Sequence, residues 1–320
     1  MQSFKDLALQ FEQHFSSRHF PEHPSSLYDP AEYILGLGGK RIRPVLCLMG
    51  NELFDDIKED AFHVASAIEL FHNFSLIHDD IMDKAPLRRG KPTVHALHGE
   101  STALLAGDVM LVVAYEELIK VHHHTKKIIQ LFNKTAKEVC EGQQLDMDFE
   151  KIEELKLEDY LKMISLKTSV LLASSLQLGA ILGGATEGNQ QHLYEFGRKL
   201  GIAFQIQDDY LDAFGDPKKF GKQVGGDILA NKKTFLMIHA LEEADNSDKK
   251  KLKELLHSNP PDKVEQVLSI FKNCGVDAWA NELKEMYLAN AFNHLEDIAV
   301  TSSRKKPLLE LAHYLIERDN

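Results

Sequence analysis

Hydrophobic residues recur at helical spacing along almost the whole of this chain. Apolar side chains return every three to four positions, and short groups of glycine, proline and asparagine interrupt the pattern. The alternation typical of β-strands is scarce, and the 320 residues include only 19 glycines and 10 prolines. The sequence therefore predicts an all-α fold, in which the apolar faces of several helices pack on one another.

The interruptions divide this pattern into a series of expected helices. The stronger ones cover 4–19, 29–37, 43–54, 59–83, 101–120, 124–148, 157–183 and 188–213. Weaker ones are expected near 233–244, 247–257, 262–273, 276–298 and 303–318. Because no linker, low-complexity tract or repeat of fixed period separates them, residues 1–320 are interpreted as one domain.

The composition limits the classes of protein to which the chain can belong. With 43% hydrophobic residues it can bury a large core, so it is interpreted as globular rather than disordered or fibrous. Its 37 basic and 49 acidic residues give a net charge of −12, which provides no general attraction for nucleic acid or an anionic membrane. A polyanionic substrate would therefore be held by local groups of cations and by metal ions.

Cysteine usage and the N-terminal segment indicate a cellular compartment. Cys47, Cys140 and Cys274 lie far apart without paired spacing, which favours a reducing environment and no disulfide framework. No run approaches the roughly 20 apolar residues that span a bilayer. The first residues, MQSFKDLALQFEQHF, have the pattern of an amphipathic helix rather than of a signal peptide. We expect a cytoplasmic protein with no membrane span.

Aspartates gather near the ends of two of the expected helices. The first cluster comprises Asp79, Asp80 and Asp83 in SLIHDDIMD, and the second comprises Asp208, Asp209 and Asp212 in AFQIQDDYLD. The outer two aspartates of each cluster are one turn apart on one helix face. Like charges at this spacing, near the negative end of the helix dipole, destabilise a helix unless a cation binds. Paired carboxylates suit Mg²⁺, which shares its remaining coordination positions with phosphate oxygens.

The repetition of this arrangement separates two interpretations. A single such cluster is commonly a solvated acidic face. Here two copies each end an apolar helix, and each precedes a basic loop, at residues 84–93 and 214–232. A loop of the second length inside a compact helical domain is more often functional than idle. If the two helices face one another, their carboxylates line the mouth of one cavity.

Cations accompany the aspartates. They are Arg88 and Arg89 after the first cluster, Lys222 and Lys232 after the second, Lys167 with Thr168 between them, and Lys40, Arg41 and Arg43 in the segment GGKRIRP. The last group stands at a glycine-preceded helix start, which is a natural anion-binding position. Arginine offers a planar fork to phosphate, and lysine offers a mobile point charge. Two basic groupings around a metal site indicate two phosphorylated substrates.

At these residues the chain resembles the trans-isoprenyl diphosphate synthases, the family of the farnesyl and geranylgeranyl diphosphate synthases. The resemblance rests on GGKRIRP at 38–44, HDDIMDKAPLRRGKPTVH at 78–95, GQQLD at 142–146, KT at 167–168, FQIQDDYLDAFGD at 204–216 and GKQVGGDILANK at 221–232. These segments follow the order of the family. The resemblance implies an isoprenoid synthase fold, an all-α bundle around a deep central pocket, in a homodimer.

The resemblance also implies roles for individual residues. The Mg²⁺ ligands would be Asp79 and Asp83 in the first cluster, and Asp208 with Asp212 in the second. They would hold about three ions per active site. The contacts of the allylic diphosphate would be Arg88, Lys167, Thr168, Gln205, Lys222 and Lys232, and those of isopentenyl diphosphate would be Lys40, Arg43, His72 and Arg89. The residues expected to be catalytic are Asp79, Asp83, Arg88, Lys167, Asp208 and Lys222.

The implied reaction makes a short-chain all-trans prenyl diphosphate. Metal and cations stabilise the diphosphate as it leaves dimethylallyl, geranyl or farnesyl diphosphate. Isopentenyl diphosphate then adds to the carbocation through its double bond, and the departing diphosphate takes the proton that restores an alkene. Apolar walls protect the cation from water.

Product length is expected to depend on the residues just before the first cluster. Ser75 lies one turn, about 5 Å, below Asp79 on the same face, and its small side chain leaves room for a prenyl tail. In the family, the positions four and five before the first aspartate control pocket depth, and here only Phe74 is aromatic. Phe74 is alternatively an ordinary core residue. This pattern favours geranylgeranyl diphosphate as product and leaves farnesyl diphosphate open.

Three other functions compete with this interpretation. A class I terpene cyclase would carry an Asn/Ser/Glu metal motif in place of the second cluster. A metal phosphohydrolase could use the pair His78 and Asp79, but would need further histidine ligands. A non-catalytic partner subunit of a prenyl synthase tends to lose one aspartate cluster, and here both are intact.

Overall fold

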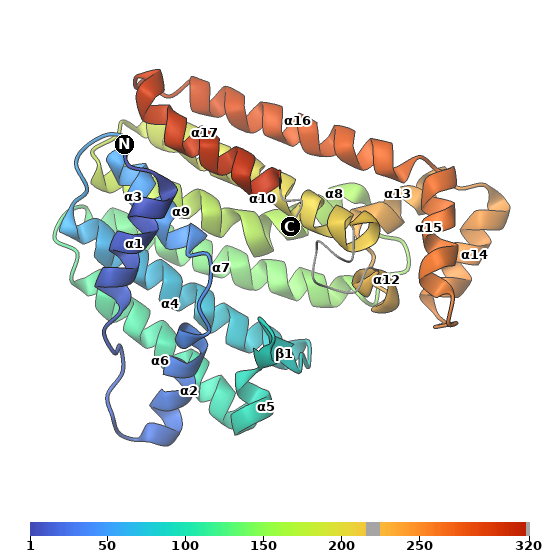
Figure 1. Ribbon diagram of the computed structural model, residues 1–320, viewed down its shortest axis with the longest axis horizontal. Coiled ribbons are helices and arrows are strands. Elements are labelled where there is room, and N and C mark those ends of the chain that lie inside the picture. The colour runs from blue at the N-terminus through green and yellow to red at the C-terminus, as the bar shows by residue number, and fades with distance from the viewer. Residues whose placement is uncertain (216–224, 318–320) are drawn as a thin grey trace. The chain divides into compact units, whose positions relative to one another are not determined.

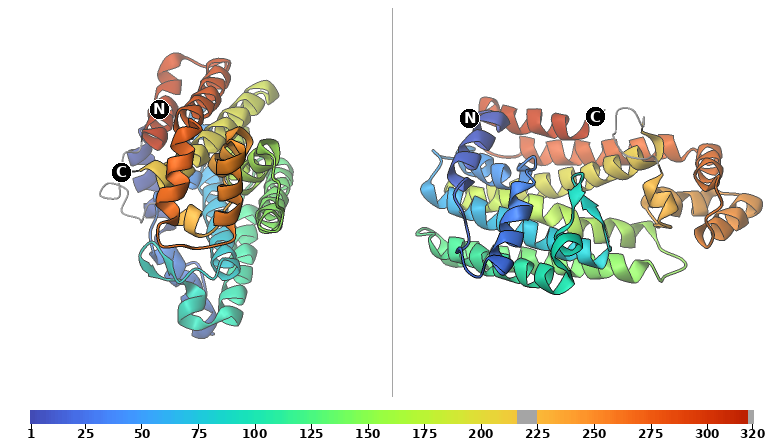
Figure 2. Two further views of the ribbon diagram at one scale, coloured as in Figure 1. Left: turned by 90° about the vertical axis from the view of Figure 1, so that its right-hand side faces the viewer. Right: turned by 60° about the horizontal axis from the view of Figure 1, so that its bottom comes forward.

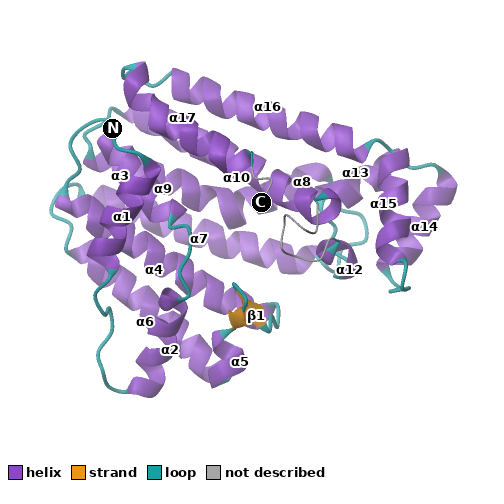
Figure 3. Cartoon of the chain, viewed as in Figure 1, coloured by secondary structure: helices purple, strands orange, loops and turns teal. Residues whose placement is uncertain are grey.

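The computed structural model describes residues 1–215 and 225–317, and their regular secondary structure is helical except for one short hairpin (Figure 3). The helices before residue 150 are α1 (Phe4–Phe15), α2 (Ser25–Gly36), α3 (Ile42–Glu52), α4 (Glu59–Met82), α5 (Val94–His98), α6 (Glu100–Ile119) and α7 (Thr125–Phe149). Those after it are α8 (Leu157–Ile164), α9 (Val170–Leu182), α10 (Glu187–Phe214), α12 (Gly226–Leu229), α13 (Phe235–Glu243), α14 (Asn246–Leu256), α15 (Lys263–Asn273), α16 (Val276–Glu296) and α17 (Ser302–Ile316). The predicted all-α class is confirmed.

The differences from the predicted helices have local causes. The helix expected at 4–19 ends at Phe15, because the Glu32 carboxylate accepts the N–H groups of His19 and Phe20 at 2.8 and 3.2 Å. These amides therefore bond to a side chain instead of continuing the helix. The helix expected at 29–37 starts earlier, at Ser25, directly after Pro24. Two short helices, α5 and α12, were not predicted.

The predicted loop at 84–93 is in fact a small hairpin. Strands β1 (Leu87–Arg88) and β2 (Lys91–Pro92) pair antiparallel, with Arg88 opposite Lys91. The two turn residues, Arg89 and Gly90, both have positive φ, of 53° and 73°, as a type I′ turn requires. The hairpin is fastened at its base, because the Thr93 hydroxyl donates to the carbonyl oxygen of Ala85 at 2.8 Å.

The described chain divides into two compact units. Unit 1 comprises Met1–Ala136, Ser174–Tyr194 and Ile298–Pro307, and unit 2 comprises Lys137–Ala173, Glu195–Asp297 and Leu308–Asn320. The first aspartate cluster belongs to unit 1 and the second to unit 2. The prediction that residues 1–320 form one domain stays a prediction.

In unit 1, α4 lies beside α6 (Figures 1 and 2) and also contacts α3. Small residues allow the close approach. A Cβ added at Gly107 of α6 would lie 2.5 Å from Nε2 of His78 on α4, and one added at Gly179 of α9 would lie 1.9 Å from the carbonyl oxygen of Cys47 on α3. Most of α4 is buried, from Ala61 to Ile77. This packing holds the helix that carries the first cluster.

In unit 2, one hydrophobic core joins α8, α10, α13, α15 and α16. Tyr160, Phe235 and Phe271 are buried in it, and Trp279 packs against its edge. The helices α13, α14 and α15 follow one another at one end of this unit (Figure 1). The core fixes α8 against α10, which carries the second cluster.

Between α8 and α9 the chain forms a π-helical turn, η1 (Ser165–Ser169). The N–H of Val170 bonds to the carbonyl oxygen of Ser165, five residues earlier. Two glycines let neighbouring helices lie directly against this turn. A Cβ at Gly142 of α7 would stand 2.3 Å from the backbone nitrogen of Lys167, and one at Gly201 of α10 would stand 2.8 Å from Cα of Ser169. Single π-turns inside helices are frequent at functional sites.

Among the described residues, the stretch Leu157–Leu182 is long and apolar enough to cross a membrane by length and composition. This stretch was not predicted as a possible membrane span, because Lys167, Thr168 and several serines interrupt its apolar residues. Its most apolar window is 72% buried inside the protein. The apolar composition of this stretch is therefore explained by its packing in the interior of the protein.

A Gly142→Ala substitution tests the approach of α7 to η1. The added methyl group would force one of the two backbones to move, since it has only 2.3 Å of space. Overpacking of this kind lowers the free energy of unfolding by about 1–3 kcal/mol. Denaturant titrations followed by circular dichroism should show this loss.

Gly188→Ala in α10 is the matched control, because nothing lies within 4 Å of a Cβ at that position. Alanine there should leave the free energy of unfolding unchanged or raise it by up to about 1 kcal/mol. Equal stability of the two variants would contradict the close packing at Gly142.

Candidate active site

The first aspartate cluster lies at the C-terminal end of α4. Asp79 is half-buried in the last turn, and Asp83 is exposed at the residue that ends the helix. The N–H of Asp83 donates to the carbonyl oxygen of Asp79 at 2.8 Å, so the two residues are stacked one turn apart. Their spacing was predicted correctly. A cation at this helix end would meet two carboxylates and the negative end of the helix dipole.

Asp80, between them, is held inside the protein. Its side chain is 2% exposed, and it accepts a two-pronged hydrogen bond from Arg88 of β1. Arg88 donates from Nε at 2.7 Å and from Nη2 at 2.6 Å. The pair fastens the hairpin to α4 and holds Arg88 next to the cluster. The sequence analysis missed this role, although Asp80 stands about 100° around the helix from Asp79.

The segment GGKRIRP places its two arginines differently. Arg41 has φ +48° and is buried, and its guanidinium bonds to Glu12 and Glu69. It therefore supports the fold. Lys40, one residue earlier, is exposed.

Arg43 belongs to a cationic group with His72 and Arg89. Nη1 of Arg43 donates to Nε2 of His72 at 3.1 Å. The guanidinium of Arg89 lies against Gly39, where an added Cβ would be 3.0–3.1 Å from it. The structure thus brings together three of the four residues that were predicted to contact isopentenyl diphosphate. Nε of Arg43 is buried without a hydrogen-bond partner among the described residues.

The charges in this group affect one another. Burial lowers the pKa of Arg43 to about 10, against the attraction of Glu69, and the nearby charge of Arg89 adds to the lowering. Burial also lowers the pKa of His72 well below its usual value, with the charges of Arg43 and Arg89 acting in the same direction. His72 is therefore neutral and accepts from Arg43. An anion would relieve both the repulsion and the unpaired donor.

The two residues expected to set product length lie on the same helix. Phe74 and Ser75 are both half-buried on α4. The ring of Phe74 stands 4.6 Å from that of His78 and 5.6 Å from that of Phe71. The Ser75 hydroxyl donates to the carbonyl oxygen of His72 at 2.8 Å.

The second aspartate cluster lies on the last two turns of α10. Asp208 is half-buried, while Asp212 caps the following short helix α12. Oδ2 of Asp212 accepts the N–H of Asp227 at 2.9 Å, and its carbonyl oxygen accepts the N–H of Gly225 at 2.7 Å. Asp227 in turn pairs with Nζ of Lys232 at 3.1 Å. Asp227, which sequence reasoning missed, therefore links Asp212 to Lys232.

The π-turn carries Lys167 and Thr168. Nζ of Lys167 donates to Asp146 of α7 at 2.6 Å. The hydroxyl of Thr168 donates to Oε1 of Gln205 on α10 at 3.5 Å. The structure thus brings together Thr168 and Gln205, two of the predicted contacts of the allylic diphosphate. Asp146 is the last residue of the segment GQQLD, whose function the sequence alone left open.

Asp209, the middle aspartate of the second cluster, is 6% exposed. It accepts hydrogen bonds from the hydroxyl of Tyr160 and, at 2.8 Å, from the amide nitrogen of Gln205. Burial raises the pKa of Asp209 to about 7, although both hydrogen bonds oppose the shift. The role of this residue resembles that of Asp80, since each middle aspartate is bonded inside its own unit.

Two predictions are not addressed by these contacts. Lys222 lies outside the described residues. The meeting of the two aspartate clusters in one cavity involves both units, and it stays a prediction.

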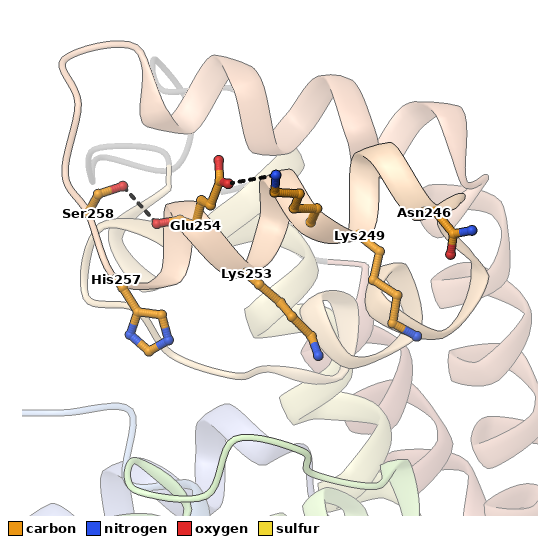
Figure 4. Close-up of a pocket in the computed structure, with 7 residues that line it drawn as sticks. Asn246, Lys249, Lys253, Glu254, His257 and Ser258 are labelled. Carbon is orange, nitrogen blue, oxygen red and sulfur yellow. Dashed lines mark hydrogen bonds and ion pairs between the residues drawn. The ribbon is translucent and has the colours of Figure 1, made fainter.

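A surface hollow of about 770 Å³ lies along α14 (Figure 4). It is lined by Asn246, Lys249, Lys250, Lys253, Glu254, His257 and Ser258. Lys250 pairs with Glu254 at 3.9 Å, and the other lysines extend from the helix surface (Figure 4). Among the described residues, none of those predicted for the site lines this hollow, which has the chemistry of a solvated basic helix.

These features define a class of protein: an all-α chain with an acidic cluster in each unit and separate cationic groups. Comparison with known proteins identifies the family within this class. The model of the polyprenyl synthetase family matches residues 24–273. The chain belongs to the polyprenyl synthetase family and is a prenyltransferase.

Individual relatives agree with this assignment. A short chain isoprenyl diphosphate synthase of Methanothermobacter thermautotrophicus is 38% identical over 299 residues, which cover 93% of this chain and 92% of the relative. A geranylgeranyl pyrophosphate synthase of Geoglobus acetivorans is 40% identical over 305 residues, covering 93% of each chain. A crystal structure of a geranylgeranyl pyrophosphate synthase superposes with a TM-score of 0.94 at 42% identity, covering 100% of both chains.

Proposed function

We propose that this chain joins isopentenyl diphosphate head to tail with allylic diphosphates and forms geranylgeranyl diphosphate, all-trans. The observation that carries this proposal is the arrangement along α4. His72, with Arg43 and Arg89, lies two turns before Asp79 on the same helix face, about 10 Å away. One helix therefore presents a site for a metal-bound diphosphate and a site for a diphosphate held directly by cations.

The outer aspartates fit Mg²⁺ by the chemistry of their donors. Asp79, Asp83, Asp208 and Asp212 offer only carboxylate oxygens, which hard divalent cations prefer. The middle aspartates are buried, whereas the outer ones are half-buried or exposed, so we assign the metal to the outer ones. When bound, Mg²⁺ supplies positive charge to the leaving diphosphate.

The side chains of the protein perform the remaining tasks. We assign to Arg88, which Asp80 holds, and to Lys167, which Asp146 holds, the role of binding the allylic diphosphate as it acquires charge. Neutral His72 keeps Arg43 oriented toward isopentenyl diphosphate without adding a further charge. We assign proton removal to the departing diphosphate rather than to a side chain.

Incubation of the purified chain with isopentenyl diphosphate, Mg²⁺ and each allylic starter tests the proposed reaction. Mass spectrometry of the products should detect geranylgeranyl diphosphate, and a metal chelator should abolish its formation. Asp79→Asn and Asp208→Asn should each lower kcat at least about 100-fold, because each removes a carboxylate that would hold Mg²⁺, whose positive charge stabilises the leaving diphosphate.

Other outcomes of this assay would favour the competing functions. Release of pyrophosphate with a cyclic or linear hydrocarbon product would indicate a terpene cyclase. Activity only after addition of a second protein would indicate a partner subunit. Either result would contradict the proposal.

The proposed product length rests on Phe74 and on the product named for the similar synthases. The Phe74 ring packs between Phe71 and His78 on α4, and the resemblance to the family implies that it limits the depth of the pocket. Phe74→Ala should therefore deepen the pocket and lengthen the product. Chromatography of the dephosphorylated products measures the change.

Phe62→Ala is the matched control, because Phe62 lies on α4 three turns before Phe74 and packs against His14. This variant should keep the product length of the wild type. An unchanged length distribution in a folded, active Phe74→Ala variant would remove Phe74 from the argument.

We further propose that the chain forms a homodimer through α6. Large apolar side chains remain exposed along one face of this helix at seven-residue spacing, namely Leu105 (57%), Val112 (57%) and Ile119 (74%). A continuous exposed apolar stripe is typical of a protein–protein interface.

Light scattering during size-exclusion chromatography should give the mass of a dimer for the wild type. The double variant Leu105→Glu/Val112→Glu should elute as a monomer, because it places charge in the centre of the stripe. Leu9→Glu, at an equally exposed position of α1 (64%), is the control and should stay dimeric. A dimeric double variant would show that α6 is not the interface.

A further inference from the structure

Asp209 is the centre of a chain of hydrogen bonds in unit 2. Both of its carboxylate oxygens are occupied: Oδ2 accepts from the hydroxyl of Tyr160, and Oδ1 accepts from Nε2 of Gln205 at 2.8 Å. Because the carboxylate is buried, loss of either donor leaves an oxygen without water to replace it. Asp209 is therefore a buried hydrogen-bond acceptor, whereas the neighbouring Asp208 is only half-buried.

The chain continues from Gln205 to the π-turn. Since the amide nitrogen of Gln205 donates to Asp209, its oxygen faces the other way and accepts from the hydroxyl of Thr168 at 3.5 Å. The orientation of the Gln205 amide is thus set by Asp209. Gln205 and Asp209 are one turn apart on α10, so the chain runs along one face of that helix.

Both ends of the chain belong to one continuous segment. Tyr160 lies on α8 and Thr168 on η1, eight residues later, while the two middle members lie on α10. The aromatic ring of Tyr160 is fixed in the core of unit 2, 6.2 Å from that of Phe235. The hydrogen bonds therefore connect α10 to the α8–η1 segment at two points. One is Tyr160, fixed in the core, and the other is Thr168, at the candidate site.

We propose that Tyr160 is a positioning residue for the allylic diphosphate site, acting through Asp209 and Gln205 on Thr168. The inference rests on the proposed function, in which Thr168 and Gln205 contact that substrate. Tyr160 itself lies in the hydrophobic core and touches no substrate. Its hydroxyl holds the Asp209 carboxylate in the one orientation that keeps the Gln205 amide directed at Thr168.

Tyr160→Phe tests the proposal, because it removes one oxygen and keeps the ring in the core. We expect kcat/KM for the allylic diphosphate to fall about 10-fold, as is common when a supporting partner of a site is removed. The KM for isopentenyl diphosphate, whose predicted contacts belong to unit 1, should not change. Binding of inorganic pyrophosphate in the presence of Mg²⁺, measured by calorimetry, should weaken in parallel.

A double-mutant cycle separates positioning from a general effect on the fold. If Tyr160 acts through Gln205, Tyr160→Phe should cause almost no further loss in a Gln205→Leu background, where the chain is already broken. Tyr287→Phe is the matched control, since Tyr287 is a partly buried tyrosine at the edge of the same core. It should have wild-type kinetics.

Several results would overturn the proposal. They are wild-type kinetics of Tyr160→Phe, equal loss for both substrates, or losses that simply multiply in the double variant. If Tyr160→Phe does not fold, Asp209→Asn replaces it, because asparagine keeps an acceptor at this position; the same kinetic pattern is then required. Should the wild-type chain form no prenyl product, the proposed function fails, and the pyrophosphate measurements still decide the role of Tyr160.

Discussion

The burial of one carboxylate in each aspartate cluster is the constraint on which the candidate site depends. A buried carboxylate requires donors, and here the donors come from segments distant in sequence. Asp80 takes the two-pronged hydrogen bond of Arg88, which draws the hairpin against α4. Asp209 takes the hydroxyl of Tyr160 and the amide of Gln205, which tie α10 to α8. In both clusters the middle aspartate is buried and stabilises the fold, whereas the outer aspartates are less buried and lie near the end of the helix.

The cations likewise divide into those bonded inside the fold and those whose donors remain available. Arg41 is satisfied by Glu12 and Glu69 within the core, whereas Arg43, two residues later, keeps a buried donor without a partner among the described residues. Burial lowers the pKa of both Arg43 and Arg89, and neighbouring arginine charges add to the lowering: Arg89 acts on Arg43, and Arg41 and Arg88 act on Arg89. A group with one buried donor that lacks a partner among the described residues, and with repulsion between its cations, favours the binding of an anion. This preference for an anion agrees with the diphosphate site that we propose here.

Helix packing explains why glycine occurs where it does. Gly142 and Gly201 allow α7 and α10 to lie against the π-turn, and any larger residue would push the Lys167–Ser169 backbone away. The π-turn itself adds a residue to one turn of helix, which changes the direction of the side chains that follow. Within the turn, Lys167 and Thr168 bond to Asp146 and Gln205, which lie on two different helices. Neither the glycine contacts nor the π-turn has a signature that hydrophobic periodicity could reveal.

The sequence by itself determined most of the helices, the one-turn spacing of the outer aspartates and the family, because periodicity, the four-residue spacing of like charges and ordered motifs are all local along the chain. It placed the ends of the helices less well, as at Phe15, where a side chain distant in sequence takes over the backbone amides. Only the tertiary structure decided which charged residues face inward. The sequence gives no reason to treat Arg41 differently from Arg43, or Asp79 differently from Asp80. They differ because burial and the availability of a partner are properties of the packed molecule rather than of the chain.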